Sequence, residues 1–195
     1  MTQNHPLKIG IVCGEHSGDR LGAELITELK KTHDLNLFGV GGPKLEALGV
    51  SSLFDFSEIN IMGLIDPLIN YRKLSQLRKS LIKIFIEEKV DFFIGIDSPD
   101  FNLGIHKALK MNHINKNIQI VSPSVWGWRQ NRIKAIKKYI DLTMCLFDFE
   151  HNFYKDHNHK SIHLGHPFSN LNKIDREITL HNKNLSSNKK YISIV

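Results

Sequence analysis

Cysteine is scarce in this sequence of 195 residues, which contains only Cys13 and Cys145. Both lie within apolar runs, and they form neither a disulfide framework nor the ligand spacing of a zinc site. No stretch approaches the roughly 18 consecutive apolar residues that a membrane-spanning helix requires. The polar residues 1–6 lead directly into an apolar run, so we expect no signal peptide. These absences favour a cytoplasmic protein.

The rest of the composition is that of a soluble globular protein, with 41% apolar and 24% charged residues. The length suffices for one well-buried α/β domain and part of another. Lysine and arginine number 26 against 20 aspartates and glutamates, which gives a net charge of +6. Such a charge suits nucleic acid, an anionic membrane surface or a phosphorylated substrate, and it also occurs on surfaces that bind nothing.

Strand and helix patterns alternate along the chain. Short apolar runs predict strands at 7–13, 35–40, 51–54, 90–94, 117–121, 141–147 and 161–164. Helical spacing predicts helices at 21–29, 44–48, 72–85, 102–110, 132–139 and 149–154. This alternation predicts an α/β fold with a Rossmann-like, doubly wound, mostly parallel sheet.

A turn that contains two glycines, Gly14–Asp19, joins the first predicted strand to the first helix. Its spacing is neither the GxGxxG pattern of dinucleotide-binding proteins nor a P-loop. Glu15 and Asp19 would repel a phosphate, and they could instead form hydrogen bonds with sugar hydroxyls. Alternatively, Ser17 or Asp19 is simply the N-cap of the helix.

The stretch Gly95–Asn102 follows a strand that we expect to be buried. In doubly wound folds, ligands bind outside the carboxyl ends of such strands, where Asp97 and Asp100 fall. Pro99 cannot continue the strand, because it has no N–H for the ladder. Asn102 could cap the helix that follows. Either aspartate could be catalytic, or both could merely shape the turn.

An apolar stretch at 59–71 is interrupted by Gly63 and Pro67, so we expect a loop, followed by a basic helix with Arg72, Lys73 and Arg78. An apolar loop beside a basic helix fits an anionic membrane surface, and packing of the loop in the core is equally compatible. The residues that would face the membrane are Ile61, Met62, Leu64, Ile65, Leu68 and Ile69.

Both tryptophans follow another predicted strand, in the segment 122–130. Trp126 and Arg129 suit stacking on a sugar face and phosphate binding, and Ser124 lies beside them. A packed loop with an arginine-capped helix is the alternative. The histidines between 151 and 166 show no HExxH spacing, so we expect a polar loop and no metal site.

From Ser169 onward the composition shifts to Asn, Lys and Ser, as in an exposed linker. Tyr191–Val195 then reads as the start of a buried strand. We therefore expect one domain at 1–168, with a linker and the first strand of a second, truncated domain at 169–195.

Several of these stretches, in collinear order from about Leu7 to Pro167, resemble lipid-A-disaccharide synthase, a bacterial glycosyltransferase of the two-Rossmann-domain (GT-B) kind. The stretches are Gly14–Asp19, Gly39–Pro43, Ile61–Gly63, Gly95–Asn102, Ser122–Arg129 and Gly165–Pro167. The segments with the aspartates and the tryptophans are the most specific of these.

The resemblance implies that UDP-2,3-diacylglucosamine is the donor and 2,3-diacylglucosamine 1-phosphate the acceptor. It implies that Asp97 is the general base, and that the substrate-binding residues are Glu15, Ser17, Gly18, Asp100, Asn102, Ser124, Trp126 and Arg129. It further implies no cofactor or metal, no nucleic acid, and a cytoplasmic protein bound peripherally to the anionic inner membrane through the 61–71 stretch.

Members of that family continue for roughly as many residues again, and the additional half binds UDP. We therefore expect this chain by itself to lack the donor site and to be inactive. A complementary C-terminal fragment or a second copy of the chain could be its protein partner. Alternative functions are another GT-B transferase, a UDP-sugar epimerase, or a non-catalytic Rossmann module that binds a nucleotide or a partner.

Overall fold

A computed structural model describes residues 5–56, 58–59, 67–112, 115–127 and 131–170. The chain divides into two compact units, residues 1–165 and 166–195. In the second unit the described residues form a short 3₁₀-helix, Pro167–Asn170. Apart from Ser169 and Asn170, the predicted linker lies outside the described residues, as does the predicted strand Tyr191–Val195, so the domain boundary at 168 stays a prediction.

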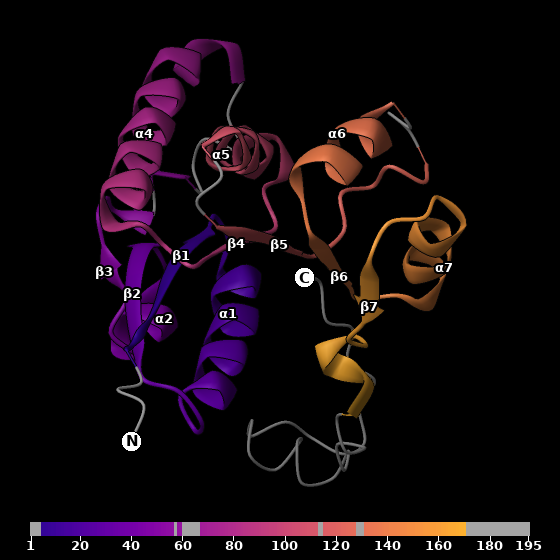
Figure 1. Cartoon of the computed structure of the whole chain (residues 1–195), viewed down its shortest axis with the longest axis horizontal. Helices are drawn as coiled ribbons and strands as arrows, with labels where there is room; N and C mark the ends of the chain where they lie inside the picture. Colours follow the sequence, from indigo (N-terminus) through magenta and orange to yellow (C-terminus); the bar gives the residue numbers. More distant parts are fainter. Residues whose placement is uncertain (1–4, 57, 60–66, 113–114, 128–130, 171–195) are drawn as a thin grey trace, which may run out of the picture. The chain divides into compact units, whose positions relative to one another are not determined.

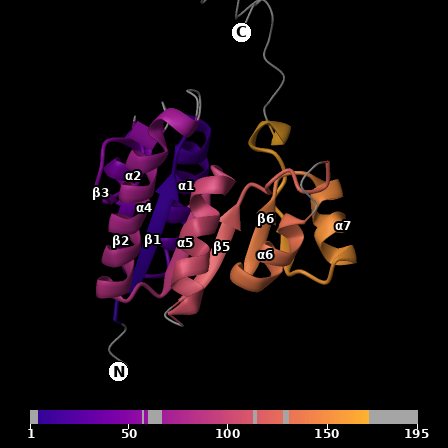
Figure 2. The same ribbon diagram turned by 90° about the horizontal axis from the view of Figure 1, so that it is seen from above.

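Seven strands form one sheet within the described part of the first unit (Figure 2). They are β1 (Leu7–Cys13), β2 (Leu35–Val40), β3 (Ser51–Ser52), β4 (Phe92–Ile96), β5 (Lys116–Ile120), β6 (Leu142–Cys145) and β7 (Ser161–His163). Their order is β3-β2-β1-β4-β5-β6-β7, and every neighbouring pair is parallel. The Rossmann-like doubly wound sheet predicted from the sequence is therefore confirmed.

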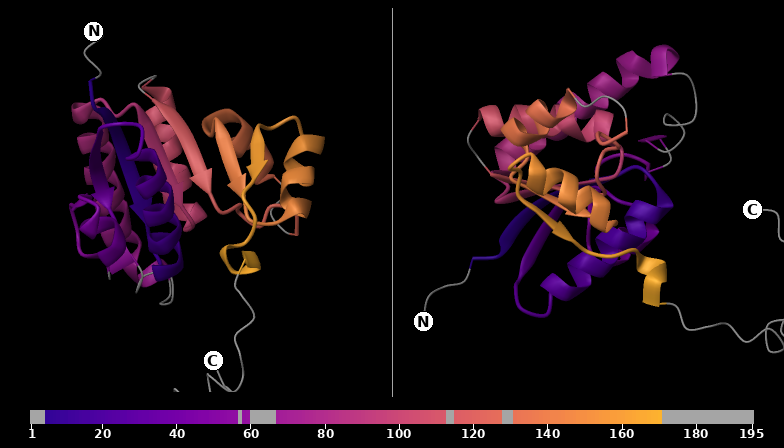
Figure 3. Two further views of the ribbon diagram at one scale, coloured as in Figure 1. Left: turned by 90° about the horizontal axis from the view of Figure 1, so that it is seen from below. Right: turned by 90° about the vertical axis from the view of Figure 1, so that its right-hand side faces the viewer.

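Helices cover both faces of this sheet. Figure 1 shows α4 and α5 on one face and α1 on the other, and Figure 3 shows α1 lying across the second face. The bounds are α1 (His16–Leu29), α2 (Pro43–Ala47), α4 (Pro67–Glu88), α5 (Pro99–Met111), α6 (Arg132–Tyr139) and α7 (Asp148–Asp156).

Three apolar clusters make up the core of the described residues, and the two larger ones lie on opposite faces of the sheet. Strand β1 contributes to both of the larger clusters, because successive side chains of a strand point to opposite faces. Ile9 and Ile11 pack in the cluster that contains Ile26 of α1. Val12 packs in the cluster that contains Phe85 of α4. From Ile9 onward, β1 is buried and reads as a continuous apolar run, as expected for a central parallel strand covered on both faces.

Two sequence-based boundaries need correction near the site. Strand β4 extends to Ile96, two residues beyond the predicted end, so Asp97 is the first residue after it. Helix α4 begins at Pro67, not near Arg72 as expected. Proline suits the first helical position, because a backbone N–H at that position has no acceptor within the helix.

The predicted apolar loop is therefore wrong for its second half, because the backbone of Leu68 and Ile69 is helical. The side chains of these two residues, and all of Ile61, Met62, Leu64 and Ile65, lie outside the described residues. Among the helices that the structure describes, none combines the length and the apolar composition that crossing a bilayer demands.

Candidate functional site

The candidate site lies between β1 and β4, where the order in which successive strands are added to the sheet reverses. Strands numbered before β4 lie on one side of this point and later strands on the other. Cys13 pairs with Ile96 at the carboxyl ends of the two strands. The turns that begin at Gly14 and Asp97 therefore leave the sheet side by side. Ligands of doubly wound folds bind at this kind of switch point.

Glycine at position 14 allows the two turns to meet. A Cβ atom there would lie 2.5 Å from the Ser98 hydroxyl oxygen and 2.7 Å from a methyl carbon of Ile59. Real Cβ atoms do not approach other atoms so closely, so any side chain at position 14 would have to displace the side chains of Ser98 and Ile59. Gly14 thus brings the β1 turn against the β4 turn.

Asp97 stands at the centre of this junction, half-buried and with a left-handed backbone (φ 53°). Ser98 is also left-handed, with φ 41°. Such conformations cost of order 1–3 kcal/mol each in residues other than glycine and cluster at functional sites. The N–H of Asp97 donates to the carbonyl of Ile120 (3.0 Å), which ties the turn to β5.

The carboxyl group of Asp97 has a raised pKa. Burial is the main cause, because it disfavours the charged form. The N–H of Ser98 donates to Asp97 Oδ1 (3.0 Å), and this bond offsets part of the rise. A carboxylate whose pKa is shifted towards neutrality is a stronger proton acceptor than an exposed one.

Asn102 occupies a different position from the one predicted. It lies in α5 rather than at its N-cap, which is Ser98. Its side chain is fully buried, and its Nδ2 donates to the carbonyl of Asp97 (2.8 Å). Asn102 therefore holds the backbone of Asp97 from below, and its burial argues against contact with a ligand.

Of the residues predicted from the first turn, Glu15 and Ser17 are exposed beside this junction. Glu15 is the N-cap residue of α1, although its side chain makes no capping hydrogen bond. The Ser17 hydroxyl lies 3.5 Å from a Glu15 carboxylate oxygen, which leaves both groups accessible to a ligand.

Gly18 and Asp19 have structural roles instead. Gly18 is buried, and a Cβ there would lie 3.2 Å from Ile96, so it permits close packing of α1 on β4. Asp19 accepts hydrogen bonds from the backbone N–H groups of Lys44 and Leu45, both at 3.0 Å. It thus caps α2, and the predictions of a sugar contact and of an α1 N-cap are both wrong for Asp19.

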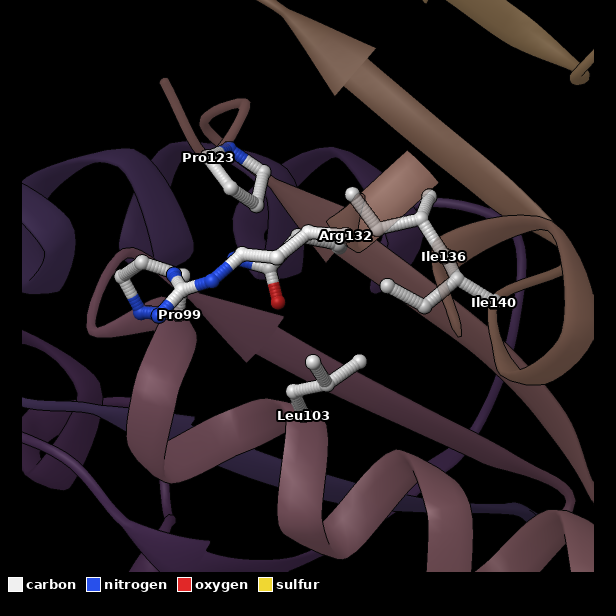
Figure 4. A pocket seen from close by; sticks show the side chains of 7 residues that line it. Pro99, Leu103, Pro123, Arg132, Ile136 and Ile140 are labelled. Atoms are coloured by element: carbon white, nitrogen blue, oxygen red, sulfur yellow. The ribbon is translucent and has the colours of Figure 1, made fainter. Parts of the chain in front are cut away.

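Asp100 lies one turn away from Asp97, at the exposed start of α5. It forms an ion pair with Arg132 at the start of α6. Beneath this pair a cavity of about 10 Å³, the size of one water molecule, is lined by Pro99, Leu103, Gln119, Pro123, Arg132, Ile136 and Ile140 (Figure 4). Asp100 therefore joins two helices.

The tryptophan segment follows β5. Ser124 and Trp126 are exposed, whereas Val125 between them is buried. Trp126 contacts Phe149 edge to face, with ring centroids 4.9 Å apart, and Phe149 stacks on Phe147. This exposed aromatic cluster (Trp126, Phe147 and Phe149) also stands at a carboxyl end, because Phe147 follows β6. Arg129 lies outside the described residues.

Residues that the sequence analysis did not select complete the site. Val121 follows β5 with a left-handed backbone (φ 66°), which is rare for a β-branched residue. Gln119, which donates to the carbonyl of Val121, and His106, which contacts Gln119, are buried polar residues below it. The sequence contains one signal for this group of residues, a glutamine within the apolar run Ile118–Val121. A buried amide needs hydrogen-bond partners, so it indicates other polar groups nearby.

The histidines of the second half have individual hydrogen-bonding roles. His151 contacts the hydroxyl of Ser161 (2.9 Å), and His159 contacts that of Thr143 (2.9 Å). His163 contacts the carbonyl of Leu146 (3.2 Å). Across the described ranges, no three His, Cys, Asp or Glu side chains come together as a metal site would require.

The fold and the site define a Rossmann-like α/β domain with a partly desolvated carboxylate at its topological switch point. Comparison with known proteins then identifies the family. A family model described as lipid-A-disaccharide synthetase matches residues 9–195. This chain belongs to that family, which confirms the resemblance found in the sequence.

Curated relatives give the same result. The chain is similar to the lipid-A-disaccharide synthase of Acinetobacter baylyi, with 41% identity over 98% of this chain and 49% of the relative. It is 49% identical to the enzyme of that name from Colwellia psychrerythraea over 82% of this chain and 40% of the relative. It is 45% identical to lipid-A-disaccharide synthase 2 of Legionella pneumophila, over 90% of this chain and 46% of the relative. The chain thus spans about half the length of these relatives.

Proposed function

We propose that this chain supplies the acceptor side and the general base of a glycosyltransferase in lipid A biosynthesis. The transferred group is 2,3-diacylglucosamine, the donor its UDP-sugar, and the acceptor 2,3-diacylglucosamine 1-phosphate. The observation that carries the proposal is Asp97, a carboxylate with a raised pKa at the switch point. Family membership supports the reaction class.

In the proposed reaction, a hydroxyl oxygen of the acceptor attacks the anomeric carbon of the donor. The new C–O bond forms as the bond to UDP breaks, and UDP leaves with the bonding electrons. Asp97 accepts the hydroxyl proton, on the face of the sugar opposite the leaving group. A base in that position gives inversion at the anomeric carbon.

The turn residues near Asp97 would bind the acceptor sugar. Glu15 and Ser17 are exposed and could accept or donate hydrogen bonds to its hydroxyls. Trp126 offers an aromatic face at the same edge of the sheet, and sugars stack on such faces. We assign Ser124 and Arg129 to the same side of the site, on the sequence argument alone.

The relatives are about twice as long as this chain, so the proposed activity belongs to the chain together with the matching remainder. That remainder would bind the UDP group and neutralise the charge that grows on the departing diphosphate. We accordingly expect no disaccharide product from these 195 residues alone. The acyl chains of both substrates make a peripheral location on the cytoplasmic face of the inner membrane the natural one.

The test is to fuse the chain to the matching remainder of the Acinetobacter baylyi relative and to supply both substrates. Disaccharide and UDP should appear in equal amounts. Release of UDP without disaccharide would indicate a hydrolase, and it would contradict the proposal. Absence of turnover in a folded fusion that binds UDP would contradict it as well.

A further inference from the structure

Three buried polar side chains lie directly beneath Asp97. Asn102 and His106 are one helical turn apart on α5, and Gln119 belongs to β5. Each is at most 1% exposed. Figure 1 shows α5 lying over β4 and β5. His106 contacts Gln119, and Asn102 and Gln119 both donate to the Asp97 carbonyl. Buried polar groups at this density require hydrogen-bond partners.

The amide of Gln119 has only one chemically sensible orientation. One end faces the carbonyl oxygens of Asp97 (3.2 Å), Ile120 (3.0 Å) and Val121 (3.3 Å). Only the amide nitrogen can face three acceptors, so the amide oxygen must point the other way. There it lies 3.1 Å from Nε2 of His106.

The orientation of Gln119 fixes the protonation of His106. An amide oxygen is an acceptor, so Nε2 must carry the proton that it donates. Nδ1 is buried and has no hydrogen-bond partner among the described residues. His106 is therefore the neutral Nε2–H tautomer. Burial also lowers its pKa to about 4, although the hydrogen bond with Gln119, the neighbouring Asn117 side chain and the Asp141 carboxylate act in the opposite direction.

The carbonyls that this network binds belong to strained residues. Asp97 and Val121, on neighbouring strand ends, both have left-handed backbones. Asn102 adds a second hydrogen bond to the Asp97 carbonyl, at 2.8 Å. Space for the network exists because residue 95 is glycine: a Cβ there would lie 2.8 Å from Gln119 Oε1 and 3.0 Å from Asn102.

We propose that Gln119, oriented by His106 and assisted by Asn102, is a positioning residue that fixes the Asp97 peptide and so directs its carboxyl group. The inference rests on the proposed role of Asp97 as the base. None of the three side chains touches a substrate. Without the amide, the two strained turns lose their common donor, and the Asp97 carboxyl should rotate towards solvent and become hydrated.

The first test needs no substitution. Long-range ¹H–¹⁵N correlation spectra of the 195-residue chain at neutral pH distinguish the two histidine tautomers. His106 should show the Nε2–H form, with Nδ1 unprotonated. A proton on Nδ1, or a charged ring, would contradict the proposed orientation of Gln119 and overturn the inference.

The second test compares Gln119→Met with Asn117→Leu. Asn117 lies on the same face of β5, and its buried amide donates to the carbonyls of His106 and Tyr139 without touching Asp97. Both substitutions remove a buried amide from one strand. Titration of the Asp97 carboxyl carbon by ¹³C spectroscopy should show its pKa lowered by at least about half a unit in Gln119→Met, because hydration removes the burial effect. It should be unchanged in Asn117→Leu.

An equal pKa of the Asp97 carboxyl in the two variants would overturn the inference. Should Gln119→Met fail to fold, Gly95→Ala displaces the same amide and should also lower the pKa of the Asp97 carboxyl.

In the fused enzyme, Gln119→Met should lower kcat about 10- to 100-fold with little change in KM, as misplacement of a catalytic group does. These spectroscopic outcomes do not depend on activity, so failure of the proposed function would be recognised separately, by normal turnover in Asp97→Asn.

Discussion

Asp97 carries the functional argument at the scale of single residues, and its position could be predicted from sequence. An apolar run followed by an aspartate and a proline indicates a carboxylate at a strand end. The roles of Asp19 and Asn102 could not be predicted in this way. Asp19 caps a helix 25 residues further along the chain, and Asn102 binds a carbonyl in the preceding turn. The partners of Asp19 become its neighbours only through the fold, whereas Asn102 reaches Asp97 because the intervening turn bends back.

His106 gives a prediction about stability and pH. Its pKa is lowered from 6.5 to about 4, so the unfolded chain binds a proton at pH values where the folded chain does not. Stability should therefore fall as the pH decreases from about 6.5 to about 4, by on the order of 3 kcal/mol, and this contribution should level off below that range. Urea unfolding at several pH values measures it.

The control for this prediction is His106→Gln, which keeps a side-chain amide near Gln119 and does not titrate. Its stability should depend less on pH in the same range. Part of the dependence should remain, because burial also lowers the pKa of His159. If the variant and the native protein lose stability equally, His106 is not the group responsible.

Among the secondary-structure elements, the strands were the most predictable part. The bounds of β1 and β2 agree with the apolar runs at 7–13 and 35–40, because each strand has only one polar residue, Lys8 or Asn36, near its start. The start of α4 could not be predicted from the pattern of apolar residues. Pro67 was read as a break, whereas at the first position of a helix proline has no hydrogen bond to lose.

The contact between the β1 and β4 turns yields a prediction for Gly14→Ala. The added methyl group would collide with Ser98 and Ile59 at 2.5 and 2.7 Å. Overpacking of this kind costs about 1–3 kcal/mol, and urea unfolding should show such a loss. Gly127→Ala is the matched control, because nothing lies within 4 Å of its added Cβ. Similar effects of the two substitutions would mean that the turns are not held in contact.

On the scale of the whole molecule, the alternation of strands and helices predicted the doubly wound sheet. The order of the strands then places Glu15 and Asp97 at one switch point. The left-handed backbone at Val121 could not be predicted, because β-branched residues rarely adopt it, and the one at Asp97 is only a minority conformation of aspartate. Both carbonyls accept hydrogen bonds from the amide of Gln119, which lies 22 residues from Asp97 in the sequence and two from Val121.

Membrane association is a prediction for the molecule as a whole. The apolar stretch 61–71 is followed by the exposed cations Arg72 and Lys73 of α4. Each cation near an anionic surface contributes about 1 kcal/mol, so vesicle binding should weaken as the salt concentration rises. Met62→Asp combined with Ile65→Asp should release the chain from anionic vesicles in a sedimentation assay.

A matched control replaces the same residue types elsewhere on the surface, by Met111→Asp combined with Ile162→Asp. Both side chains are exposed, and they lie outside the apolar stretch. This control should sediment with vesicles as the native chain does. Undiminished sedimentation of the Met62 and Ile65 double variant would show that the stretch does not bind the membrane.

The measurement that tests the central claim most directly is turnover by Asp97→Asn in the enzyme fused to the matching remainder of a relative. Asparagine preserves the size of the side chain and cannot accept the proton. Turnover should fall by at least about 10²-fold, the usual contribution of a general base, while donor binding changes little. Asp100→Asn, three residues further along the chain and paired with Arg132 at the start of α5, should retain most of the activity. Near-normal turnover in a folded Asp97→Asn enzyme would contradict the account.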